Sequence, residues 1–195
     1  MRSFFLPALL AALSAACASA PAAPMSAQER LDRAQALATE WYTYSEVLAL
    51  KLIDEYGAPD VIEAERLTWY NKGPWSKVAV WNDEDYYYSG TVGPDDLEQT
   101  LLYAVPREKR KDLAAFSDKL AVSKDGRQLS VRGNDEGRNY LTLNLAHEII
   151  QGVRSPDDAR AFYDRIYQLS ESGKSSPYLQ GLLFLRLPGD AAPAP

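Results

Sequence analysis

Residues 57–81 read Gly-Ala-Pro-Asp-Val-Ile-Glu-Ala-Glu-Arg-Leu-Thr-Trp-Tyr-Asn-Lys-Gly-Pro-Trp-Ser-Lys-Val-Ala-Val-Trp, and this stretch decides the fold. Two β-prone runs flank a Gly-Pro pair, which is the pattern of a β-hairpin. Strand alternation places four apolar side chains on one face, namely Leu67, Trp69, Val78 and Val80. We therefore expect a hairpin that buries this face against the helix preceding it.

The preceding segment has the pattern of one long helix from Ser26 to Tyr56. Ser26 and Glu29 have the spacing of a capping box, and Gly57 is a typical helix terminator. Between them, small and apolar residues recur at steps of three and four, which keeps one stripe facing a core. The run Trp41–Tyr44 is β-prone, so the pattern also allows a break there.

The rest of the chain alternates between strand and helix signals. We expect strands at Tyr86–Tyr88 and from Leu97, and a tight hairpin around Asp125-Gly126. Two helices follow, the second beginning at Ser155-Pro156, and their short link predicts an antiparallel pair. The expected fold class is α+β: a long N-terminal helix, an antiparallel sheet of four to six strands, and a C-terminal antiparallel helix pair.

The first 25 residues have the pattern of an export leader and a tether. Arg2, a short apolar run and Leu13-Ser14-Ala15-Ala16-Cys17 predict a signal peptide over residues 1–17 whose last residues match a lipobox. Cys17 would then carry a lipid. The alternative is ordinary cleavage after Ala16-Cys17-Ala18, which discards the cysteine. Residues 18–25 predict a flexible tether, 26–187 a single domain, and 188–195 a disordered tail.

Composition excludes several classes of function. A formal net charge of −6 argues against a nucleic-acid partner. The single cysteine lies in the leader, and one histidine remains, so we expect neither a zinc site nor a cofactor. Asp83 and Asp85 lack the further oxygen ligands of a calcium loop. No nucleophile elbow or phosphate-binding loop is present, so the sequence assigns no catalytic residue.

Two groups of residues are candidate contact sites. The first is an aromatic partner surface formed by Trp75, Tyr86, Tyr87 and Tyr88. The second is a ligand groove on one helix face, formed by Tyr140, Asn144, His147, Glu148 and Gln151. Each group has a structural alternative: core packing for the aromatic rings, and a solvent face for the polar stripe.

A basic helix face offers a third candidate. Arg107, Lys109, Arg110 and Lys111 follow Pro106, with Glu108 and Asp112 interrupting them. Such a face can touch anionic headgroups, or it can simply be a solvated surface.

Several short motifs are shared with known proteins. Over roughly residues 52–183, the chain resembles an uncharacterised family of bacterial exported proteins with no assigned function. The shared motifs are Tyr-Gly-Ala-Pro-Asp (56–60), Trp69-Tyr70-Asn71, Gly73-Pro74-Trp75, Leu97-Glu98-Gln99, Asn144-Leu145-Ala146-His147 and Ser176-Pro177-Tyr178. Over a shorter stretch, the Gly-x-Pro-Asp turn and the Trp-Tyr strand are similar to the small lipoprotein of the outer-membrane barrel-assembly machinery. The residues from Leu97 onward have no counterpart there.

These patterns predict an envelope lipoprotein, anchored through Cys17 to the outer membrane and facing the periplasm, that binds an envelope protein without catalysis. A soluble periplasmic or secreted protein is the alternative localisation. The alternative function is a periplasmic enzyme or small-ligand carrier using the polar site around His147.

Overall fold

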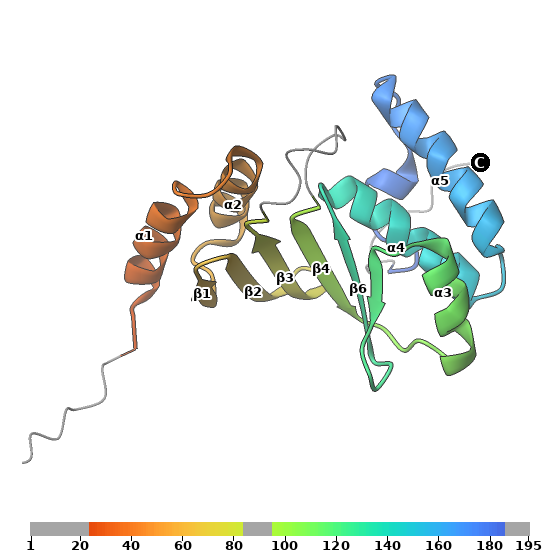
Figure 1. Cartoon of the computed structure of the whole chain (residues 1–195), viewed down its shortest axis with the longest axis horizontal. Coiled ribbons are helices and arrows are strands. Elements are labelled where there is room, and N and C mark those ends of the chain that lie inside the picture. The colour runs from red at the N-terminus through yellow and green to blue at the C-terminus, as the bar shows by residue number, and fades with distance from the viewer. Residues whose placement is uncertain (1–23, 84–94, 186–195) are drawn as a thin grey trace, which may run out of the picture.

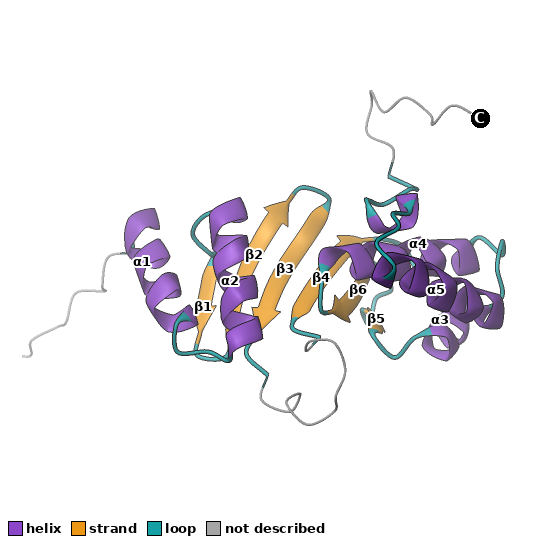
Figure 2. Ribbon diagram, turned by 90° about the horizontal axis from the view of Figure 1, so that it is seen from above, coloured by secondary structure: helices purple, strands orange, loops and turns teal. Residues whose placement is uncertain are grey.

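The computed structural model describes residues 24–83 and 95–185, which form a six-stranded antiparallel sheet with helices on one face (Figures 1 and 2). The strand order is β1-β2-β3-β4-β6-β5. The strands are β1 (Val61–Glu63), β2 (Arg66–Lys72), β3 (Trp75–Trp81), β4 (Leu97–Leu102), β5 (Leu120–Val122) and β6 (Gln128–Gly133). The α+β class and the antiparallel sheet are therefore confirmed.

The helices are α1 (Ala27–Ala38), α2 (Thr43–Tyr56), α3 (Arg110–Phe116), α4 (Glu136–Ile150) and α5 (Pro156–Glu171). Two short 3₁₀ turns, η2 (Arg107–Lys109) and η3 (Pro177–Leu179), precede α3 and follow α5. Within the described residues, no helix has the combination of length and hydropathy that crossing a bilayer requires.

The expected long N-terminal helix is wrong, because the chain breaks between α1 and α2. Ser26 and Glu29 form the predicted capping box at the start of α1. The helix ends at Ala38, and the buried Trp41 donates its indole N–H to the carbonyl of Ala64, 2.9 Å away, between β1 and β2. This long-range anchor holds the β-prone segment out of helical geometry, so two shorter helices form.

The β2–β3 hairpin has the predicted register. Leu67 pairs with Val80 and Trp69 with Val78, and all four side chains are buried. Gly57 ends α2 with φ = 77°, a left-handed value that favours glycine, and its carbonyl accepts the indole N–H of Trp69 at 2.9 Å. The end of the helix and the first long strand are thus fixed together.

The two C-terminal helices that the sequence predicts are present, and a further helix packs against them. Helices α4 and α5 pack together, and α3 packs against both of them. The segment that follows α5 forms no strand among the described residues, and its 3₁₀ turn η3 packs against α4. The basic helix face after Pro106 indicates a helix where α3 lies, but the packing of α3 against α4 and α5 depends on contacts between residues distant in the chain.

The two faces of the sheet have different surroundings. Helix α2 packs on β2 and β3 and helix α4 on β6, and Figure 2 shows these helices over the same face. The opposite face of the central strands has no covering helix among the described residues (Figure 1). Side chains of that face include Arg66, Tyr70, Lys77, Trp81, Glu98, Leu102 and Arg132.

Candidate functional site

Trp75, predicted to lie on a partner surface, is part of the core. It is 2% exposed, its ring stacks on Tyr140 with centroids 5.6 Å apart, and its indole N–H donates to Glu136 Oε1 at 3.1 Å. Gln99 Nε2 donates to the same carboxylate oxygen at 2.9 Å. Because α4 supplies both the hydrogen-bond acceptor and the stacking ring for Trp75, this residue is not part of an exposed partner surface. The other three members, Tyr86, Tyr87 and Tyr88, lie outside the described residues.

The predicted ligand groove on α4 binds a segment of the same chain. Asn144 Nδ2 donates to the carbonyls of Tyr178 and Gly181, at 3.2 and 2.8 Å. Its Oδ1 accepts from the backbone N–H of Leu183 at 2.8 Å. All three bonds hold the C-terminal segment across the helix, so Asn144 has a structural role here.

His147 lies in the same contact zone. Its Nδ1 is 2.7 Å from the hydroxyl of Tyr103, and its ring stacks on Phe184 with centroids 4.5 Å apart. Burial lowers the pKa of His147, and the negative charge of Glu148 opposes that shift. The imidazole is thus held between Tyr103, which follows β4, and Phe184 of the C-terminal segment.

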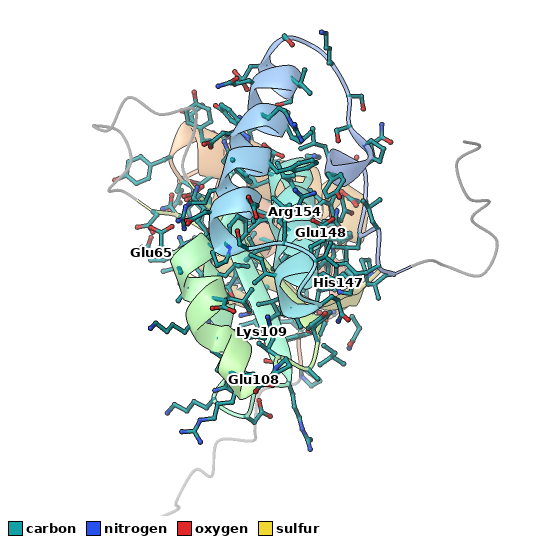
Figure 3. The ribbon with its side chains drawn as sticks, turned by 90° about the vertical axis from the view of Figure 1, so that its right-hand side faces the viewer. Glu65, Glu108, Lys109, His147, Glu148 and Arg154 are labelled. Carbon is teal, nitrogen blue, oxygen red and sulfur yellow. The ribbon has the colours of Figure 1, made fainter. Side chains whose placement is uncertain are left out.

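Glu148 and Arg154 complete the network, and Figure 3 shows them beside His147. Glu148 accepts hydrogen bonds from Arg154 Nε at 2.5 Å and from the hydroxyl of Tyr178. Gln151 is exposed. The hollow beside Asn144, His147 and Glu148 measures about 130 Å³, below the range of ordinary small-molecule sites. The arrangement therefore favours a structural clamp over a ligand groove.

A larger cleft of about 480 Å³ lies where β4 begins, against β6 and the residues around β5. The lining side chains are mostly charged or polar and come from both chain halves: Asp83, Asp95, Asp96, Glu98, Asp118, Lys119, Ala121, Ser130, Val131 and Arg132. Its volume is in the range of ligand sites and of grooves that accept a peptide side chain.

Carboxylates outnumber cations around this cleft. Lys119 pairs with Asp95 at 2.7 Å, and Arg132 with Asp83 at 2.9 Å. Asp118 is exposed and belongs to no salt bridge with the residues that the structure describes. The potential in the cleft therefore attracts a positively charged group.

Asp96 marks the inner limit of the cleft. It is 1% exposed, its Oδ2 accepts a hydrogen bond from Ser45 of α2 at 2.5 Å, and Oδ1 has no hydrogen-bond partner in the described part of the chain. Burial raises the pKa of Asp96 to about 6, although the Ser45 hydrogen bond and the Arg132 charge lower it. A perturbed carboxyl can be catalytic, but Asp96 offers the cleft almost no exposed surface and is held by Ser45.

Trp81 connects the cleft to the open sheet face. The guanidinium groups of Arg66 and Arg132 lie 4.6 and 4.9 Å from its ring centroid, and its indole N–H donates to Glu98 Oε2 at 3.0 Å. Glu98 also forms an ion pair with Lys77. Aromatic and charged side chains thus run continuously across β2, β3, β4 and β6.

Sequence reasoning missed this cleft. Glu98 and Thr100 occupy alternate positions of β4, a pattern that indicates one solvent-facing side of the strand. The cleft residues of β6 and of the β5 region are distant from β4 in the sequence, so no local pattern indicates that they lie beside it. Among the described residues, no group of three or more His, Cys, Asp or Glu side chains is placed to hold a metal ion.

Comparison with known proteins returned no match among family models, curated proteins or solved structures.

Proposed function

We propose that this chain is a lipid-anchored protein of the bacterial cell envelope, in the outer membrane facing the periplasm, whose domain binds a partner and catalyses no reaction. The observation that carries the binding role is the acid-lined cleft on a sheet face without helical cover. The anchoring role depends on the leader pattern that ends at Cys17.

The chemistry of the cleft favours a partner with a basic segment. Its lining has five carboxyl groups and two cations, so a Lys or Arg side chain of the partner gains attraction on entry. Trp81 and the guanidinium groups stacked on it offer flat contact area beside the cleft. This surface takes the place of the aromatic surface that the sequence predicted around Trp75.

A photo-crosslinking residue at Ala121, an exposed position in the cleft, tests the binding role in whole envelopes. We expect a specific adduct at Ala121 that Asp118→Asn weakens. The matched control is a crosslinker at Tyr44 of α2, which is 62% exposed and belongs to the helical layer. Identical adducts from both positions, or none from Ala121, would exclude the cleft as the binding surface.

The anchor is tested separately. The exported protein is expected to have an intact mass that includes acyl chains and to partition into detergent. A Cys17→Ser variant should lose both properties. A wild-type protein whose mass shows cleavage beyond Cys17 would exclude the anchor.

A further inference from the structure

The end of β4 opposite the acidic cleft is basic. Four exposed cations lie there: Arg107 of η2, Lys111 of α3, and Lys124 and Arg127 of the β5–β6 turn. None of the four belongs to a salt bridge within residues 24–83 and 95–185. The basic helix face that the sequence indicates is thus extended by a second segment. We define these four residues as the basic end.

One backbone and one side-chain hydrogen bond hold the two segments of the basic end together. The N–H of Val105 donates to the carbonyl of Gly126 at 2.8 Å, and Arg110 Nη1 donates to the carbonyl of Lys124 at 3.4 Å. Gly126 has φ = 76°, and a Cβ there would lie 2.5 Å from Arg110 Nη2. The left-handed φ of Gly126 favours glycine at this position, so the backbone of the turn is held beside the segment that precedes α3.

The nearby carboxylates neutralise only part of this charge. Asp112 is paired with Lys109 at 3.7 Å, and Asp125 accepts from Ser123 Oγ at 2.6 Å and from the Arg127 N–H at 3.1 Å. Glu108 is the third carboxylate of the region, beside Lys109 in Figure 3. A local excess of positive charge remains in a chain whose net charge is −6.

An exposed apolar side chain adjoins the basic end. Leu102 is 75% exposed, and it pairs in register with Gln128, next to Arg127. With Pro74 and Leu185 it lines a hollow of about 300 Å³. Cations beside an exposed leucine are the combination that binds a bilayer interface, where charge meets the headgroups and the apolar group enters the acyl boundary.

The pairing of cations with an apolar side chain favours a membrane over a soluble anion, because a soluble anion gains nothing from the exposed Leu102. If Cys17 carries the lipid, as proposed above, the tether also keeps the domain close to a bilayer. We propose that the basic end and Leu102 form a contact surface for an anionic bilayer, leaving the acidic cleft accessible from the periplasm.

Vesicle binding by the exported chain with Cys17→Ser, which has no acyl group, tests this surface independently of the anchor. We expect co-sedimentation with vesicles of 30% phosphatidylglycerol in phosphatidylcholine, and loss of binding as salt is raised. A Lys124→Gln/Arg127→Gln variant should bind about thirtyfold more weakly, given the usual contribution of each cation near a charged membrane. Leu102→Gln should reduce binding severalfold.

The charge-matched control is Lys51→Gln/Lys174→Gln, which removes two exposed cations from other elements and should bind as the parent does. Thermal unfolding of every variant checks that the fold is intact. Equal losses in both double variants, equal binding to pure phosphatidylcholine, or binding only to a soluble polyanion would overturn the proposal. Failure of acylation at Cys17 would leave the vesicle result standing, so the two proposals fail separately.

Discussion

The two faces of the sheet are built by the same strands, and strand alternation gives them opposite compositions. Under α2, Leu67, Trp69 and Val80 are fully buried and apolar. On the other side of the same strands, Arg66, Tyr70 and Trp81 are flanked by charged partners and remain at least partly exposed. Apolar burial stabilises a fold and charged pairs at a surface contribute little, so the covered face supplies the stability. The open face is then available for recognition.

The sharpest test of this comparison uses two neighbours in β2. Trp69→Ala is expected to lower the free energy of unfolding by about 3–5 kcal/mol, since it removes a fully buried ring and its hydrogen bond to Gly57. Tyr70→Thr, at a residue 46% exposed, should change it by about 0.5 kcal/mol or less while keeping β propensity. Urea unfolding measures both. Similar losses at the two positions would mean that the open face is covered in the native protein.

Asp96 lies at the boundary between the faces, and its titration sharpens the comparison. The raised folded pKa, about 6, means that the folded state holds this proton more tightly than the unfolded chain does. The stabilising contribution of the protonated form is therefore present at low pH and is lost as pH rises from about 4 to about 6. An Asn in place of Asp removes this titration.

Asp96→Asn should therefore gain stability relative to the parent as pH rises through that window, by about 2–3 kcal/mol. Above pH 7 the difference between the two proteins should be constant. Denaturant unfolding from pH 4 to 8 measures it, and comparing the two proteins cancels the titration of the other carboxyls. A difference that does not vary with pH would show that Asp96 has an ordinary pKa.

The smallest expected effect concerns the open face itself. A double-mutant cycle with Arg66→Gln and Trp81→Leu should give a coupling energy of about 0.5–1 kcal/mol, the usual contribution of an exposed cation–π contact. Glu63→Gln is the control, because Arg66 also pairs with Glu63 at 2.5 Å. A coupling of several kcal/mol would place these side chains in a desolvated environment and contradict an open face.

Local sequence patterns correctly predicted the features that are formed by residues close together in the chain. The capping box at Ser26, the β2–β3 register and the β5–β6 pairing around Asp125-Gly126 depend on residues close in sequence, and each is present in the structure, although in that turn only Gly126 has a positive φ. Trp75 was misplaced because its partners, Tyr140 and Glu136, are more than sixty residues away. The same is true of Asn144, whose three bonds to the C-terminal segment no periodicity can indicate.

The sequence by itself determined the α+β class, the hairpin with its two faces, and the expectation of a leader ending at Cys17, because hydrophobic period, turn residues and leader composition are local properties. Only the tertiary structure decided the break before α2, the burial of Trp75 and the use of the α4 stripe as a clamp. It also decided the separation of an acidic cleft from a basic end along β4. These features depend on which distant segments pack together, and a side chain becomes buried, paired or free only when that packing is complete.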